Sequence, residues 1–209
     1  CKKIFIIGAG PSGVELACKI NDIYQKKFEV NIVERTAEIL NKNKIFNKEE
    51  AEKALAAKSI NLLLNSSVNE ITDTEISITN ESNRVDKLPY CVVIWTAGIK
   101  PNLPEFAQEI QKTNNKILIN DKLQLPSHQN VFVLGDISSI EGKPDLPVTA
   151  QLAMQQGVHV ALNLNMQFKN ENLIPFQFKD NGEMISLGIG EASIAGLGLT
   201  LSGKFAYDL

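Results

Sequence analysis

Apolar residues in this chain form short runs that alternate with polar, helix-forming segments. The first run, IFII, is followed by a glycine-rich turn and then by apolar positions at helical spacing. These positions are Val14, Ala17, Ile20 and Ile23. A second apolar run, FEVNIVE, comes next. Strand, helix and strand in this order predict a βαβ unit with parallel strands.

The following segment predicts another helix and more of the same sheet. We expect a helix from about Asn47 to Lys58, with Asn47 as its N-cap. Its first turn would carry Glu49 and Glu50. INLLL predicts a third parallel strand, whereas SVNEITDTEISIT and VDKLPY predict a small antiparallel insertion. CVVIW, which begins at Cys91, is a continuous apolar run of the kind that is buried on both faces of a parallel sheet.

The pattern changes after the Gly- and Pro-rich segment TAGIKPNLP, which we take as the end of the first domain. ILIN predicts a strand, and VFVLGD predicts a second, buried strand that ends in Gly135 and Asp136. A long helix is expected from about Ala150 to Gln167. The last segment predicts short strands joined by an Asp-Asn-Gly turn and by Gly-rich turns. The fold class predicted is α/β.

Three glycines after the first strand, Gly8, Gly10 and Gly13, form the pattern GxGxxG. Gly8 allows a tight turn, Gly10 lets the backbone approach phosphates, and Gly13 lets the helix pack close to the sheet. The second strand ends in Glu34, where a carboxylate binds the adenosine ribose and repels a 2′-phosphate. The sequence therefore predicts a dinucleotide site that prefers NADH to NADPH, a preference that the adjacent Arg35 would soften. The alternative is a glycine-rich turn without a ligand.

Composition and charge narrow the function further. The chain has 209 residues and a net charge of −3 without a basic cluster, which argues against a nucleic-acid partner. Cys1, Cys18 and Cys91 form no CxxC pair, and we expect reduced thiols, with Cys18 and Cys91 in or near the core. His128 and His159 show no metal-ligand spacing, so no metal is predicted. No apolar run is long enough to span a bilayer.

The order of motifs resembles the C-terminal half of the type II NADH:quinone oxidoreductases. These are flavoproteins with two dinucleotide-binding domains and belong to the pyridine nucleotide-disulfide oxidoreductase superfamily. The motifs are IFIIGAGPSGVELA, NIVE, VVIWTAGIKPN, VFVLGD, PVTAQLAMQQG and DNGEMISLGIGEASIAGLGLTLSGKFAYDL. The resemblance covers the whole chain, and the closing segment is most similar to the cyanobacterial and plastid-related branch.

The resemblance implies a division of the chain into three parts. These are a Rossmann-like NAD(H)-binding domain at 1–97, the returning part of an FAD-binding domain at 98–168, and the start of a C-terminal interface domain at 169–209. The first FAD-binding glycine motif and the membrane-docking helices of the family would lie outside the sequence. We therefore expect the chain to be a piece of a longer protein.

The resemblance also implies roles for individual residues. The residues assigned to cofactors are Gly8, Gly10, Gly13, Glu34, Ala97 and Gly98 for NADH, and Gly135, Asp136, Ala150 and Gln151 for FAD. The quinone would contact Gln151, Gln155 and Lys204. Glu15 would lie near the flavin and relay a proton, although an acid near a helix N-terminus is also stabilised by the helix dipole alone. Gln156 stands where the family often has Glu, which removes a charge.

The implied reaction is hydride transfer from NADH to FAD, followed by reduction of a membrane quinone without proton pumping. We expect peripheral attachment to the cytoplasmic face of a plasma or thylakoid membrane through the missing helices, and a homodimer. Two alternatives are the NAD module of a pyridine nucleotide-disulfide reductase and an inactive nucleotide-binding fragment. The isolated chain is expected to bind NADH weakly and to lack quinone reductase activity, because the first FAD motif is missing.

Overall fold

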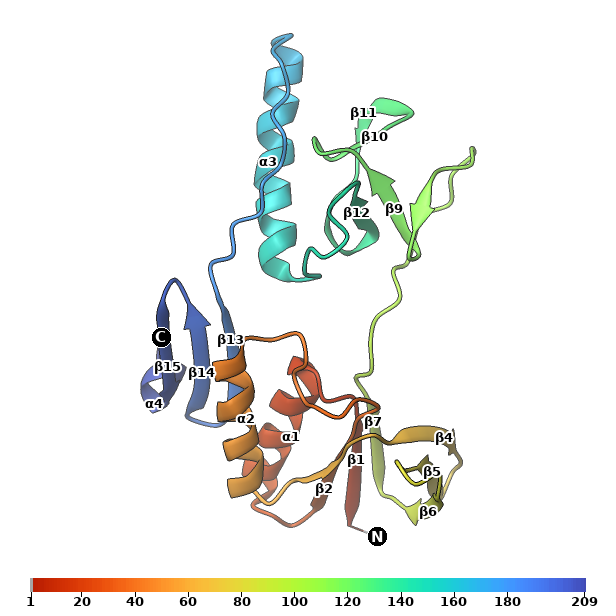
Figure 1. The fold of residues 1–209 in the computed structure, drawn as a ribbon, viewed down its shortest axis with the longest axis vertical. Helices are drawn as coiled ribbons and strands as arrows, with labels where there is room; N and C mark the ends of the chain where they lie inside the picture. Colours follow the sequence, from red (N-terminus) through yellow and green to blue (C-terminus); the bar gives the residue numbers. More distant parts are fainter. Residues whose placement is uncertain (1) are drawn as a thin grey trace. The chain divides into compact units, whose positions relative to one another are not determined.

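The computed structural model describes residues 2–209, which divide into two compact units. One unit contains the residues up to Gly98 together with Asp180–Leu209, and the other contains Ile99–Lys179 (Figure 1). The C-terminal segment therefore belongs with the first part of the chain rather than with the residues that immediately precede it.

A four-stranded parallel sheet forms the centre of the first unit, with strand order β3-β2-β1-β7. The strands are β1 (Lys3–Ile7), β2 (Glu29–Val33), β3 (Asn61–Leu63) and β7 (Val92–Trp95). The helices are α1 (Pro11–Tyr24) and α2 (Ile45–Ala57). All three strand pairings are parallel. The predicted βαβ unit, the third parallel strand and the α/β class are confirmed.

The two faces of this sheet are covered by different structures, because successive side chains of β1 point in opposite directions. Ile6 packs with Val14 of α1 and Leu55 of α2. Phe5 packs on the other face with Ile76 of an antiparallel sheet. That sheet consists of β4 (Ser67–Ile71), β5 (Glu75–Thr79) and β6 (Val85–Pro89). The predicted antiparallel insertion is confirmed.

The C-terminal segment adds a third, antiparallel sheet to the first unit. It consists of β13 (Glu183–Gly188), β14 (Glu191–Gly196) and β15 (Leu199–Gly203), followed by α4 (Lys204–Tyr207). Ile185 and Leu187 of β13 are buried in the same core cluster as Val14 and Leu55. The C-terminal sheet therefore packs against the two helices that cover the parallel sheet. The short strands predicted for this segment are confirmed.

The second unit is built around helix α3 (Ala150–Phe168), whose predicted extent is confirmed within one residue. Thr149 caps it, because its hydroxyl accepts a hydrogen bond of 3.2 Å from the Leu152 N–H. The strands are β8 (Lys112–Thr113), β9 (Lys116–Ile119), β10 (Gln124–Leu125), β11 (His128–Phe132) and β12 (Ser138–Ile140). Ile117, Ile119 and Leu152 are among its buried core residues.

Helix α2 begins earlier than predicted. Its N-cap is Lys44, so Asn47 lies inside the first turn, and Glu49 and Glu50 fall after that turn. The Asn47 side chain is fully buried and donates a hydrogen bond of 3.0 Å to the carboxylate of Glu183. Asn47 therefore makes a contact with a residue distant in sequence instead of capping the helix, and local capping rules do not include such contacts.

Two predictions of burial were also wrong. Within residues 2–209, β7 pairs with β1 alone and is therefore an edge strand, and its last residue, Trp95, is 60% exposed. Cys91, just before it, is exposed, whereas Cys18 is buried as expected. Ile23 lies in α1 as its helical spacing predicts, but its side chain is 56% exposed.

The segment VFVLGD does not form the buried strand that its apolar run predicts. β11 ends at Phe132 and, among the described residues, pairs with β10 alone, so all of its residues are exposed or half-buried. Gly135 and Asp136 lie in a short 3₁₀ turn, Gly135–Ile137, ahead of β12. Val133, between them and β11, is buried.

Candidate dinucleotide site

A cleft of about 680 Å³ opens at the carboxyl ends of the parallel strands of the first unit. Ligands of open α/β sheets bind at this edge. The glycine turn after β1, the residues after β2 and the residues after β7 all contribute to its lining. The lining residues include Gly8, Gly10, Pro11, Glu34, Arg35, Trp95, Ala97 and Gly98.

The three glycines of the turn have three different surroundings. A Cβ on Gly13 would lie 1.9 Å from the Gly8 carbonyl oxygen, so only glycine allows α1 to pack this closely against the turn. Gly8 has a φ of +105° and packs against the backbone of Ala97. A Cβ on Gly10, by contrast, would have no neighbour within 4 Å. Gly10 therefore faces the open cleft at the start of α1, where N–H groups can meet an anion.

The acid predicted to bind a ribose is held in place by the glycine turn itself. One carboxylate oxygen of Glu34 accepts a hydrogen bond of 2.8 Å from the Ala9 N–H. The other accepts from the Thr36 N–H at 2.9 Å and from the Thr36 hydroxyl at 3.0 Å. Burial raises the pKa of Glu34, but these hydrogen bonds outweigh it and hold the pKa below its ordinary value. Glu34 is thus kept ionised beside the cleft.

The residues after β7 close the cleft on its other side. The Thr96 hydroxyl donates hydrogen bonds to the carbonyl oxygens of Ile7, at 2.8 Å, and Gly8, at 3.2 Å. These bonds fix the next two residues, Ala97 and Gly98, in the lining of the cleft. The small side chain of Ala97 and the absence of one on Gly98 leave room for a ligand against the backbone.

Glu15 is not among the residues that line the cleft. Its carboxylate accepts a hydrogen bond of 3.0 Å from the Ser186 N–H in β13. The contact fastens α1 to the C-terminal sheet, as does Asp22, which accepts from the Ile189 N–H at 2.8 Å. The proton-relay role of Glu15 stays a prediction.

In the second unit, Gly135 and Asp136 line a small cavity together with Thr149 and Gln156. Gln156 is 1% exposed, and its side-chain oxygen accepts a hydrogen bond of 2.6 Å from the Gly135 N–H. This residue was noted in the sequence only as a missing charge. The sequence could have indicated this contact, because Gln156 lies on the apolar stripe of α3 and a buried polar side chain needs a hydrogen-bond partner.

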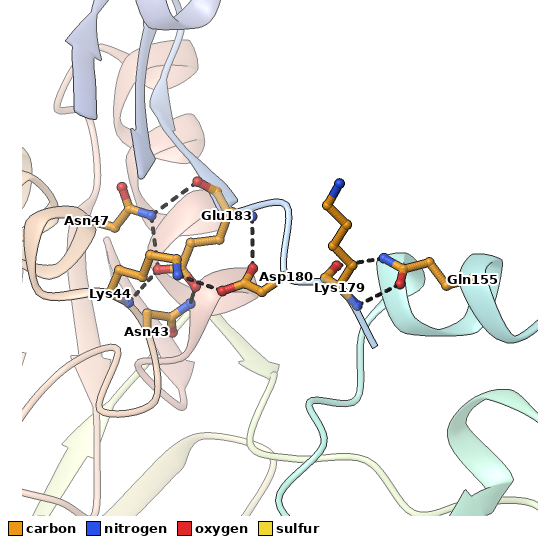
Figure 2. A network of polar contacts seen from close by, with 8 residues as sticks. Asn43, Lys44, Asn47, Gln155, Lys179, Asp180 and Glu183 are labelled. Carbon is orange, nitrogen blue, oxygen red and sulfur yellow. Dashed lines mark hydrogen bonds and ion pairs between the residues drawn. The ribbon is translucent and has the colours of Figure 1, made fainter. Parts of the chain in front are cut away.

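The residues assigned to a quinone have structural contacts of their own. Gln155 donates a hydrogen bond of 2.8 Å to the Lys179 carbonyl and accepts one of 2.9 Å from the Lys179 N–H (Figure 2). Gln151 is half-buried in the first turn of α3, next to Ala150. Lys204, in the first unit, forms an ion pair of 2.5 Å with Asp208. Their part in quinone binding stays a prediction.

Within residues 2–209, no group of His, Cys, Asp and Glu side chains is arranged to hold a metal ion. In the same part of the chain, no helix combines the length and apolar character needed to cross a membrane.

The parallel sheet, the glycine turn and the acid at the end of β2 define a dinucleotide-binding α/β protein. The chain belongs to the pyridine nucleotide-disulphide oxidoreductase family, whose model matches residues 2–157. This membership was part of the resemblance noted in the sequence, and it is confirmed.

Individual relatives agree with the narrower resemblance to type II NADH:quinone oxidoreductases. The chain is 34% identical to the demethylphylloquinone reductase NdbB of Synechocystis, over 98% of this chain and 51% of that protein. It is 28% identical to a type II NADH:quinone oxidoreductase of Staphylococcus saprophyticus, over 97% and 54%. The chain therefore spans about half the length of the curated relatives that it matches.

The same fold occurs in a solved structure. The structure of NDH2 from Plasmodium falciparum in complex with NADH superposes with a TM-score of 0.84 over 97% of this chain and 59% of that one. The two sequences are 18% identical, so this similarity shows the fold.

Proposed function

We propose that this chain provides the NADH-binding domain, and part of the FAD-binding domain, of a quinone oxidoreductase that pumps no protons. The observation that carries the proposal is the cleft of the first unit, where the open backbone at Gly10 lies near the preset carboxylate of Glu34. The relatives named as NADH:quinone and demethylphylloquinone reductases support the choice of substrates.

In the first unit, the backbone N–H groups at the start of α1 would bind the pyrophosphate, and Glu34 would accept hydrogen bonds from the adenosine ribose. The same carboxylate would repel the 2′-phosphate of NADPH. Ala97 and Gly98 would leave space for the nicotinamide half. Glu15 is proposed to relay a proton in the assembled enzyme.

In the second unit, the residues present fit a flavin. Gly135 has a φ of +72°, and a Cβ there would have only the Ala153 methyl within 4 Å, at 3.8 Å, so the backbone is open to a close ligand. Asp136 would accept a hydrogen bond from the ribityl chain, and the first turn of α3, at Ala150 and Gln151, would place N–H groups near the ring. FAD, when bound, supplies the hydride acceptor and the electron donor.

The quinone would be bound by Gln151, Gln155 and Lys204. Because membrane quinones are apolar, we infer that the whole protein works at a membrane surface, on the cytoplasmic face of a plasma or thylakoid membrane. A homodimer without a nucleic-acid partner is part of the same proposal. The length of the relatives supports the expectation that this chain alone binds NADH weakly and reduces no quinone.

The proposal is tested by titrating NADH and NADPH into the wild type, Glu34→Ala and Glu29→Ala. Trp95 is the single tryptophan and lines the cleft, so energy transfer from it to reduced nicotinamide reports binding. Glu34→Ala should weaken NADH binding about tenfold and remove the preference over NADPH, since one charge-assisted contact is lost. Glu29→Ala, at the opposite end of the same strand, should bind as the wild type does. Equal affinities of all three proteins for both nucleotides would refute the ribose assignment.

A further inference from the structure

The carboxylate of Glu183, the first residue of β13, joins the C-terminal sheet to the segment that leads into α2 (Figure 2). One oxygen accepts hydrogen bonds from the Lys44 N–H, at 2.5 Å, and from the Asn47 side chain, at 3.0 Å. The other accepts from the Asn43 side chain at 3.1 Å. Lys44, the N-cap, makes no side-chain cap of its own. Glu183 therefore accepts the N–H of the N-cap residue, as the acid of a capping box does from within a helix, and its charge suits a helix N-terminus.

The contact is reinforced by groups around it. The Asn47 side chain also donates to the Glu183 carbonyl at 3.3 Å and accepts from the Ser193 hydroxyl. Asn47 and Ser193 are both fully buried. At the exposed end of the junction, Lys44 forms an ion pair of 2.7 Å with Asp180. Each group would lose its partner if the junction separated, so the junction fixes the start of α2.

The segment just before this helix forms part of the dinucleotide cleft. Its residues Leu40, Asn41, Lys42 and Asn43 line the cleft. At its beginning, the Leu40 N–H donates a hydrogen bond of 2.9 Å to the Ala9 carbonyl in the glycine turn. Leu40 has a φ of +48°, which a leucine adopts only at a cost. The segment is thus held at one end by the glycine turn and at the other by Glu183.

We propose that Glu183 is a positioning residue for the adenosine half of the dinucleotide. This inference rests on the proposed function. The segment 40–43 follows β2 and lines the cleft on the side of Glu34, the residue assigned to the adenosine ribose. Glu183 itself is not among the lining residues, so it acts through Asn43 and Lys44. Nucleotide affinity thereby depends on a residue of the C-terminal sheet, 139 positions from Lys44.

The test measures the affinity of the full chain for ADP-ribose by calorimetry, at a temperature below the unfolding transition of every variant. Glu183→Gln keeps the shape but places an amide donor or a neutral oxygen against Lys44 and Asn43, and should weaken binding about tenfold. Glu183→Asp keeps the charge but is shorter, and should give a loss of about threefold. Glu191→Gln is the control, because this exposed carboxylate of the same sheet pairs with Lys58, outside the cleft lining.

Affinity, rather than stability, decides between positioning and a merely structural role. ADP-ribose affinities of folded Glu183→Gln within about twofold of the wild type, or an equal loss in Glu191→Gln, would overturn the proposal. If Glu183→Gln does not fold, Glu183→Asp decides by the same criterion. A wild type without affinity for ADP-ribose would instead refute the proposed function. In that case, amide exchange at Leu40 and Asn43, expected to be faster in the Glu183 variants, still tests the positioning.

Discussion

The Glu34 carboxylate accepts a hydrogen bond of 2.8 Å from the backbone N–H of Ala9, inside the glycine turn. The acid at the end of β2 and the turn at the end of β1 therefore form one preorganised structure before any ligand arrives. A site whose polar groups are already oriented loses less conformational entropy on binding. This connection makes the cleft a better candidate for nucleotide binding than the two sequence motifs taken singly.

Substitutions of two glycines by alanine should separate folding from binding. Gly13→Ala would place a Cβ 1.9 Å from the Gly8 carbonyl oxygen, so the helix must move, and the free energy of unfolding should fall by about 3 kcal/mol. Gly10→Ala meets no atom within 4 Å and has an ordinary φ of −73°, so its stability should stay within about 0.5 kcal/mol of the wild type. The measurement is urea denaturation followed by circular dichroism.

Gly10→Ala should affect the binding of NADH instead of stability. The new methyl group of Gly10→Ala projects into the cleft and should raise the dissociation constant about tenfold, because the pyrophosphate can no longer approach the backbone. A Gly10→Ala protein with wild-type affinity would show that phosphates bind elsewhere. Wild-type stability of Gly13→Ala would contradict the close packing of α1.

The parallel sheet and the cleft could be predicted because their signals are local. The spacing of the glycines, the helical period after them and the acid at the next strand end all lie within residues 4–34. The start of α2 could not be predicted in this way, because its N-cap residue, Lys44, has no capping side chain and its N–H is bound by Glu183, which is distant in sequence. Burial of Trp95 was overestimated because an apolar run does not tell whether its strand is central or at an edge.

The site in the second unit illustrates the same limit. The motif VFVLGD predicts a buried strand, but in the described part of the chain β11 has a single neighbouring strand, and strand neighbours are set by tertiary contacts. Gln156 was visible on the inward-facing stripe of α3 between Leu152 and Val160, all of them buried. Its hydrogen-bond partner, the Gly135 N–H, could not be predicted, because the two residues meet only in the folded structure.

The hydrogen bond that the buried Gln156 side chain accepts from the Gly135 N–H should contribute to stability. Gln156→Leu removes the acceptor of the Gly135 N–H and should lower the free energy of unfolding by about 1–3 kcal/mol. Gln167→Leu, an exposed glutamine of the same helix, is the control and should change it by less than about 0.5 kcal/mol. Chemical denaturation measures both. Equal stabilities of the two variants would show that the hydrogen bond to Gly135 contributes nothing.

The low pKa of Glu34 predicts a pH dependence of stability. Burial raises this pKa, but the N–H groups of Ala9 and Thr36 and the Thr36 hydroxyl lower it below the ordinary value of 4.5. Because the folded-state pKa is below the unfolded one, the carboxylate stabilises the folded state fully above the unfolded value. This contribution is lost as the pH falls through the folded-state pKa. The stabilisation is lost because the unfolded chain binds a proton at a higher pH than the folded protein does.

Urea denaturation of the wild type and Glu34→Gln from about pH 7 to about pH 3 measures this contribution as the difference between their free energies of unfolding. The difference should be constant at neutral pH and should shrink as the pH falls from the ordinary carboxyl pKa of 4.5 toward the lower folded-state pKa. Thr36→Val removes one of the hydrogen bonds that lower the folded-state pKa. In this background the loss should begin at the same pH, which the unfolded chain sets, but it should be smaller and should be complete at a higher pH. A difference that does not change with pH would mean that the hydrogen bonds to Ala9 and Thr36 do not favour the ionised form of Glu34.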